Sequence, residues 1–131
     1  RGADVVAATT HSPEPVVRHA WLAPGAHVTS VGVNPEGAEL EDKLVADASV
    51  FVESRDAVLA PFPAGANDLR GLDPERLAEL GEVLSGTRPG RTDAEQITVY
   101  KSVGVGVMDA AAAALVLKAA AANGTGTEVE L

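Results

Sequence analysis

ITVYKSVGVGVMDAAAAALVLKAAAA, residues 97–122, is the stretch that decides the fold. Its first part, Ile97 to Val103, is rich in residues that favour strands, and its last part is rich in alanine, the best helix former. Two glycines lie between them. A strand, a glycine turn and a helix in this order indicate an α/β fold that meets its ligand at the carboxyl edge of the strand. We therefore expect a ligand near Lys101 and Ser102.

The preceding sequence alternates in the same way. Short apolar runs predict strands, and apolar residues at helical spacing after an acidic first turn predict helices. This alternation predicts an α/β fold, with a parallel sheet covered by helices on both faces. The expected strands are 4–8, 27–33, 49–53 and 97–103; the expected helices are a short turn at 17–22, then 39–48, 73–85 and the closing alanine-rich segment.

Composition narrows the class of protein. The 131 residues suit one domain or part of one, and 46% apolar with only 3% aromatic residues predicts a core of Ala, Val and Leu. A net charge of −9 argues against nucleic acid as a partner. The absence of cysteine excludes a thiol nucleophile, a disulfide framework and a cysteine zinc site. We expect a cytoplasmic protein, because the opening residues do not resemble a signal peptide.

The alanine-rich segment does not look like a membrane span. Its apolar run, 110–117, has eight residues and is followed by Lys118, whereas a span needs about 20. We expect a buried helix and no membrane partner.

Several motifs leave their chemistry open. The segment Gly104 to Asp109 resembles the start of G-x-G-x-x-G, but a carboxylate at its third position would repel a pyrophosphate. Its loop either lets the backbone approach a ligand ring or is simply a tight turn. Lys101 is a nucleophile, a charge anchor or an ordinary edge lysine. Val31 to Asn34 is a ligand loop or, more simply, the start of an Asn-Pro-Glu-Gly turn.

The histidines and the acids at 39–42 give weaker indications of function. The histidines, His11, His19 and His27, lack the spacing of metal ligands, so we expect them to be solvated or structurally bonded and expect no metal. The acids at 39–42 most simply serve a helix amino terminus.

Five segments together resemble the ornithine cyclodeaminase/mu-crystallin family, which includes alanine dehydrogenases and imine reductases. They are ADVVAATTHSPEPV (3–16), WLAPGAHVTSVGVN (21–34), ELEDKLVADASVFVES (39–54), LGEVLSGTRPGRT (80–92) and ITVYKSVGVGVMDAAAAALV (97–116). The resemblance implies that residues 1–122 are the second half of a Rossmann-type NAD(P)-binding domain with a returning carboxyl-terminal helix, followed by a flexible tail, 123–131. The bare starting strand and this resemblance both suggest a fragment, with G-x-G-x-x-G upstream. We therefore expect the chain as given to bind NAD poorly and to be inactive alone.

The resemblance also implies site residues. Ala8 and Thr9 match a strand end that approaches the dinucleotide. The residues Val31, Gly32, Val33 and Asn34 match the loop beside nicotinamide and substrate. Ser102 matches a nicotinamide contact and Val103 a substrate contact.

Asn34 departs from the family pattern. Cyclodeaminases have a catalytic Asp at this position, and an amide cannot titrate near neutral pH. We therefore expect an NAD- or NADP-dependent oxidoreductase that acts on a small amino or imino acid, as a homodimer. The alternatives are an ornithine cyclodeaminase and a non-catalytic, crystallin-like binding protein.

Overall fold

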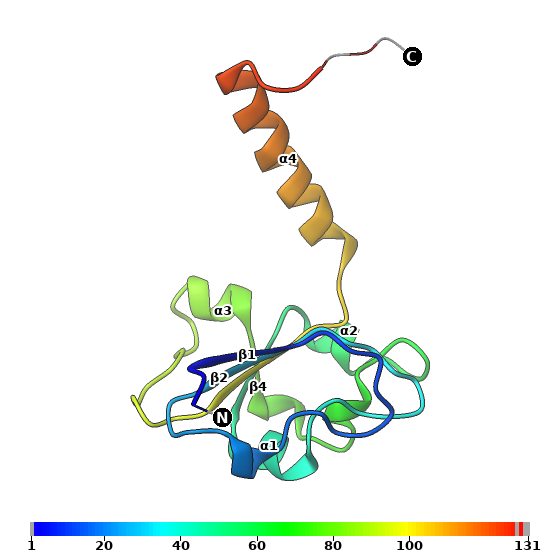
Figure 1. Ribbon diagram of the computed structural model, residues 1–131, viewed down its shortest axis with the longest axis vertical. Coiled ribbons are helices and arrows are strands. Elements are labelled where there is room, and N and C mark those ends of the chain that lie inside the picture. The colour runs from blue at the N-terminus through cyan, green and yellow to red at the C-terminus, as the bar shows by residue number, and fades with distance from the viewer. Residues whose placement is uncertain (1, 128, 130–131) are drawn as a thin grey trace.

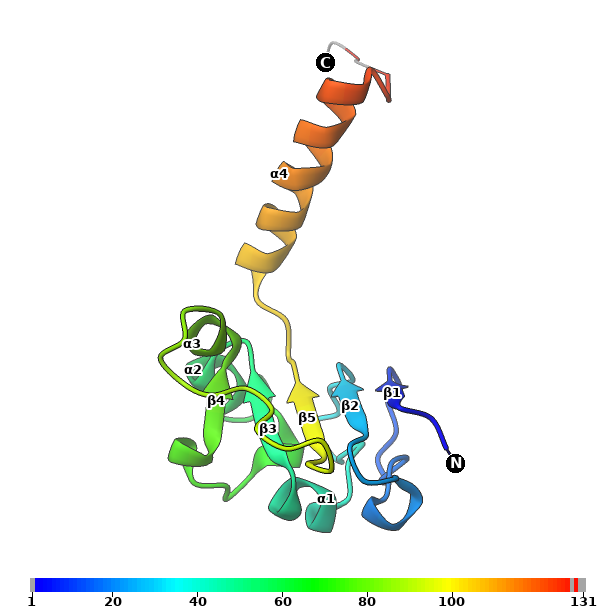
Figure 2. The same ribbon diagram turned by 90° about the vertical axis from the view of Figure 1, so that its left-hand side faces the viewer.

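The computed structural model describes residues 2–127 and 129, and its centre is a sheet of five parallel strands in the order β1-β2-β5-β3-β4 (Figure 2). The predicted α/β class with a parallel sheet is confirmed. The strands are β1 (Val5–Ala8), β2 (His27–Ser30), β3 (Ser49–Val52), β4 (Leu77–Glu79) and β5 (Thr98–Lys101). The α-helices are α1 (Asp42–Asp47), α2 (Arg55–Val58), α3 (Leu80–Leu84) and α4 (Gly106–Asn123), and short 3-10 turns lie at η1 (His19–Trp21), η2 (Asn67–Leu69) and η3 (Pro74–Arg76).

One face of the sheet carries the core. Val28 pairs in register with Val99, which pairs with Val50, and all three are at most 2% exposed. Leu44 and Val45 of α1 belong to the same buried cluster, so α1 covers this face. The aliphatic core that the composition predicted is confirmed.

The second face is only partly covered. Near β3 and β5, Leu80 and Val83 of α3 line an open groove with Phe51 and Tyr100. Helices therefore lie on both faces, as predicted. At the β1 edge, however, Val5 is 63% exposed, so the expectation that the first strand is covered on both sides is wrong for these residues.

The prediction of one helix over 73–85 is wrong, because the middle of this segment forms a strand. Asp73 does cap a helical turn, since its side chain accepts a hydrogen bond from the Glu75 N–H, but that turn ends at Arg76. The chain then forms β4, which pairs with β3, and α3 follows as a separate short helix. Pairing with the free edge of β3 overrides a helical spacing of leucines, because the edge has backbone groups to satisfy.

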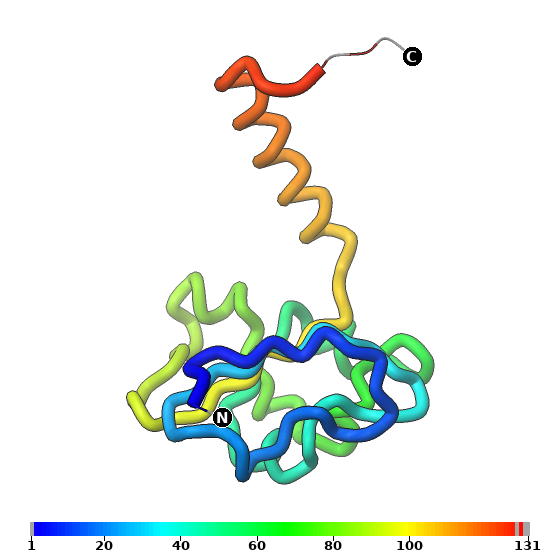
Figure 3. The backbone as a smooth tube through the Cα atoms, in the orientation of Figure 1, coloured from blue at the N-terminus to red at the C-terminus, as the bar shows by residue number. Residues whose placement is uncertain are grey.

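The alanine-rich helix differs most from expectation. α4 projects away from the sheet, and none of its described residues is buried (Figures 1 and 3). The predicted buried, returning helix is therefore not what these residues form by themselves. The helix is apolar on all sides, which is typical of a helix surrounded by other apolar groups. By length and composition alone it could cross a membrane.

We predict that deleting residues 106–131 changes the free energy of unfolding of the sheet by less than about 0.5 kcal/mol, because α4 adds nothing to the core. Urea unfolding followed by circular dichroism measures this. Leu44→Ala, which opens a cavity under the same sheet, serves as the destabilising control. A loss as large as the control's would mean that α4 packs on the sheet.

Candidate functional site

The carboxyl edge of the sheet gathers the residues that the sequence singled out. The strands run parallel, so their ends meet at one edge, above which α4 rises (Figure 2). The Val31 N–H donates to the Ala8 carbonyl at 3.1 Å, and the Ser102 N–H donates to the Ser30 carbonyl at 3.0 Å. The loops after β1, β2 and β5 therefore form one continuous surface, with Thr9 and Val31 exposed on it.

Lys101 lies directly beneath this edge and is wholly buried. Its Nζ lies 2.9 Å from Asp68 Oδ2, and donates to Ser30 Oγ at 2.9 Å and to the Gly32 carbonyl at 2.5 Å. The sequence left three roles open for Lys101. The role of an ordinary lysine at the sheet edge is wrong, because the side chain is buried. A buried ammonium with three oxygen partners is a charge anchor, because all its N–H groups are occupied.

Glu39 is the second buried charge of the edge and is 1% exposed. Its Oε1 accepts from the Thr10 N–H and hydroxyl, both at 2.6 Å. Its Oε2 accepts from Ser30 Oγ at 2.7 Å and from the Gly32 N–H at 3.0 Å, and lies 3.9 Å from Lys101 Nζ. One carboxylate thus joins the loops that follow β1 and β2.

Gly32 is the point where these loops come closest. A Cβ at this position would lie 2.1 Å from the Thr10 carbonyl oxygen and 2.3 Å from the Glu39 carboxylate. Only glycine allows that approach. The loop residue that the sequence matched to the ligand side is therefore required for packing at the same time.

Glu53 holds the loop that follows β5. Its Oε1 accepts from Ser102 Oγ at 3.0 Å, from the Val103 N–H at 2.8 Å and from the Gly104 N–H at 2.9 Å. Gly104 has φ 78°, a conformation that favours glycine. The loop between β5 and α4 is therefore ordered from the end of β3.

Asn34 forms a turn, as its simpler interpretation predicted. Its Oδ1 accepts from the Glu36 N–H at 2.9 Å, and its Nδ2 donates to the His11 carbonyl at 3.0 Å. Asn67 Nδ2 donates to the Asn34 carbonyl at 2.7 Å and to the Pro35 carbonyl at 2.6 Å. The side-chain amide of Asn34 thus bonds to backbone through both its oxygen and its nitrogen, which supports a structural role for this residue.

His27 behaves as a structural residue. His27 Nδ1 lies 2.8 Å from Thr98 Oγ1, and burial, followed by the charge of Arg91, lowers the pKa of His27. Among residues 2–127 and 129, no group of His, Asp and Glu side chains could hold a metal ion. Asp109, which argued against a phosphate loop, lies exposed in the first turn of α4.

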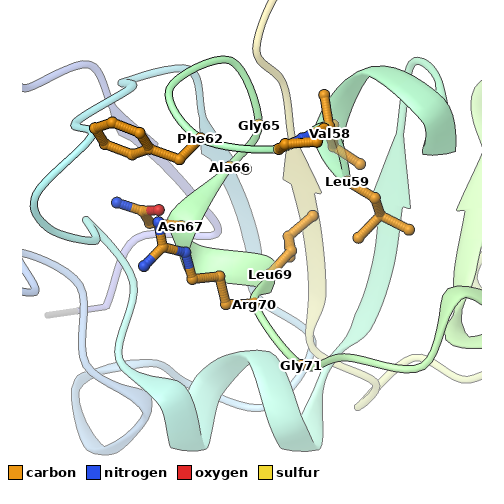
Figure 4. A pocket seen from close by; sticks show the side chains of 11 residues that line it. Val58, Leu59, Phe62, Gly65, Ala66, Asn67, Leu69, Arg70 and Gly71 are labelled. Carbon is orange, nitrogen blue, oxygen red and sulfur yellow. The ribbon is translucent and has the colours of Figure 1, made fainter.

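A separate hollow lies between α2 and η2 (Figure 4). It has a volume of about 260 Å³, and none of the residues predicted from the sequence lines it. Its walls include Leu59, Phe62 and Leu69, with Arg70 at the side. This hollow is distinct from the carboxyl edge, where the predicted residues converge.

Sequence reasoning missed the acids of the site. Glu39 was assigned with its neighbours to a helix amino terminus, yet only Asp42 lies in the first turn of α1, and Glu39 is buried under the edge. Asp68 and Glu53 gave no local signal. A lysine within the apolar strand β5 was the available clue, because a buried cation requires nearby carboxylates.

We predict that Gly32→Ala destabilises the chain by about 1–3 kcal/mol, because the added methyl group overlaps backbone and a buried carboxylate. Thermal and urea unfolding measure the change. Gly106→Ala is the matched control, since a Cβ there meets nothing within 4 Å. Equal stability of the two variants would contradict the close approach at Gly32.

We also predict an acid-sensitive contribution from Glu39. Burial raises the pKa of this carboxyl, but the hydrogen bonds from Thr10 and Ser30 and the charge of Lys101 outweigh it and lower the pKa overall. A lowered folded-state pKa stabilises the fold above the ordinary glutamate value, about 4.3, and the contribution is lost as the pH falls through the folded value.

Measurement of the unfolding free energy between about pH 3 and about pH 7, a range that brackets the ordinary glutamate titration, tests this expectation. Glu39→Gln should lose part of the decline in stability on acidification, because the titrating group is gone. Glu14→Gln, at an exposed position, is the control and should keep the wild-type decline. Parallel curves for Glu39→Gln and wild type would contradict the assignment.

Comparison with known proteins finds a matching family model and similar solved structures. The model of the ornithine cyclodeaminase/mu-crystallin family matches residues 1–124. Ketimine reductase mu-crystallin of Mus musculus is 43% identical over 112 residues, which are 85% of this chain and 34% of that protein.

Two solved structures share the fold. Thermococcus litoralis Δ(1)-pyrroline-2-carboxylate reductase in complex with NADH and L-proline has a TM-score of 0.77 at 33% identity, over 95% of this chain and 39% of that one. An archaeal alanine dehydrogenase dimer with bound NAD has a TM-score of 0.78 at 26% identity, over 98% of this chain and 41% of that one. The chain thus spans about two fifths of the length of these structures.

Proposed function

Because the chain belongs to the ornithine cyclodeaminase/mu-crystallin family, we propose that it forms part of an NAD(P)-dependent oxidoreductase acting on a small amino or imino acid. The observation that carries the proposal is the carboxyl edge. The loops after β1, β2 and β5 are tied into one surface there, and ligands of doubly wound α/β proteins bind at such an edge. The similar structures hold NADH or NAD.

The cofactor would be NAD or NADP. Ala8 and Thr9 would approach the dinucleotide. Its nicotinamide end would be lined by Val31, Gly32, Val33 and Ser102, and Val103 would face the substrate. Bound at this edge, the nicotinamide would supply the hydride, and these residues would orient it and exclude water. The firmly held Gly32 and Ser102 backbones suit that positioning role.

Substrate and reaction type are proposed from the relatives. A ketimine reductase and a pyrroline-2-carboxylate reductase both act on imino acids, as their names state. Asn34 supports reduction over cyclodeamination, because its amide cannot titrate and is already bonded to backbone.

The assembly and location are also proposals. A homodimer is supported by the dimeric alanine dehydrogenase of similar fold. A cytoplasmic protein without a membrane partner is supported by the two charged residues of α4, Asp109 and Lys118, because charges inside a bilayer are costly.

We predict that the protein that carries this chain, taken at its full length, oxidises NADH or NADPH when given a cyclic imino acid, or a 2-oxo acid with ammonia. Loss of cofactor absorbance measures the reaction. The 131-residue chain alone should bind NAD poorly by calorimetry, because it lacks G-x-G-x-x-G.

Other outcomes would point elsewhere. Conversion of ornithine to proline and ammonia without net NADH would establish a cyclodeaminase. Tight cofactor binding without turnover of any amino or imino acid would favour a binding protein. Micromolar NAD affinity of the chain alone would show that its own residues suffice for the dinucleotide.

A further inference from the structure

The core face of the sheet changes character at its carboxyl edge. The row formed by Val28, Val99 and Val50 is aliphatic. Two residues further along the strands, Ser30 pairs in register with Lys101, and both are 0% exposed. Ser30 and Lys101 thus bring polar groups into the core where the strands end, beneath the predicted ligand surface.

The polar groups there satisfy one another. Lys101 Nζ contacts three oxygens, those of Asp68, Ser30 and Gly32, and Glu39 accepts four hydrogen bonds. The second oxygen of Asp68, Oδ1, accepts from the Leu40 N–H at 2.9 Å. Such a fully bonded network specifies one arrangement of its members, whereas a partly bonded one would be costly.

We propose that Lys101 is a positioning residue: with Asp68 and Glu39 it holds the Gly32 peptide groups, and thereby fixes the loop from Val31 to Asn34 in the conformation that meets the cofactor and substrate. This proposal deepens the proposed function and rests on it for the identity of the ligand. Lys101 itself is not exposed on the ligand surface, since it is wholly buried, and it acts through Gly32.

Gly32 is held from both sides by opposite charges. Its N–H donates to Glu39, and its carbonyl accepts from Lys101. Charge-assisted hydrogen bonds are shorter and stronger than neutral ones, so they resist displacement of the backbone. A shift of about 1 Å at a reacting centre costs on the order of 100-fold in rate, so a rigid loop has catalytic value.

Two residues of the turn η2 also stabilise this loop. Asp68 of η2 contacts Lys101, while its neighbour Asn67 donates to the Asn34 and Pro35 carbonyls. The segment from Gly32 to Pro35 is therefore bonded at its far end by Asn67, and its near end is bonded by Lys101, the partner of the adjacent Asp68.

Stability alone does not account for the charges. A buried ion pair is often no more stabilising than apolar side chains of equal volume, although removal of one partner is strongly destabilising. The aliphatic row beside it shows that this sheet packs without charges. The geometry of the loop is the feature that only the charged network supplies.

The decisive variant removes the pair together. Lys101→Met/Asp68→Asn removes the ammonium and its nearest carboxylate together. Glu39 loses the cation 3.9 Å away but keeps all four hydrogen-bond donors, and the Asn oxygen can still accept from Leu40. The Gly32 carbonyl loses its ammonium. Leu77→Ala is the matched control, a cavity in the same core on β4, away from the loop.

Ser30→Ala is the second variant, in case the double variant does not fold. It keeps the contact between Lys101 and Asp68 and removes the hydroxyl that links Lys101 to Glu39. All variants are made in the protein at its full length, and circular dichroism checks their folding.

The first readout is the division of the effect between kcat and KM. We expect kcat of Lys101→Met/Asp68→Asn to fall on the order of 10–100-fold, and that of Ser30→Ala about threefold to tenfold, with smaller changes in KM. Leu77→Ala should lose stability but keep kcat. A folded double variant, or a folded Ser30→Ala, with wild-type kcat would overturn the proposal.

The second readout does not require turnover. Hydrogen exchange of the Gly32 amide, taken relative to that of Val28 in β2, should accelerate at least about tenfold in the double variant and stay unchanged in Leu77→Ala. An unchanged ratio would overturn the proposal even if the enzyme assay failed. If wild type shows no turnover but the ratio changes, the proposed function fails while the positioning role stands.

Discussion

The ammonium of Lys101 is the interaction on which the ligand edge depends. It lies between Asp68 and the Gly32 carbonyl, with Glu39 close by, where loops from three segments meet the core face. A lone charge in that position would cost several kcal/mol, so its carboxylate partners must be in place for the strands to close as they do. The same pairing of Lys101 with its carboxylates therefore orders the loops of the edge and keeps the core intact.

The sheet shows how pairing can prevail over local pattern. Leu77, Leu80, Val83 and Leu84 share one face of a hypothetical helix, yet Leu77 belongs to a strand and is 0% exposed. The edge of β3 offers backbone hydrogen bonds to whichever segment reaches it. Helical spacing carried no information about that edge, because the edge exists only after distant segments have assembled.

α4 illustrates the opposite case, in which local pattern was sufficient. An alanine-rich segment after a glycine loop forms a helix of 18 residues whether or not anything covers it. The surface of this helix is apolar on all sides. What covers that surface does not follow from propensity, since burial is a relation between segments.

The sequence by itself determined the α/β class, the parallel strands, the family and the strand ends at which the candidate site lies, because strand and helix signals and family motifs are local. Only the tertiary structure decided that Glu39, Asp68 and Glu53 support that site, and that Lys101 is an anchor. Glu39, Glu53 and Asp68 lie about 30 to 60 positions from Lys101 in the sequence, separations that local patterns do not span. Buried charges are paired by the folded chain, and their partners are known only once the strands lie side by side.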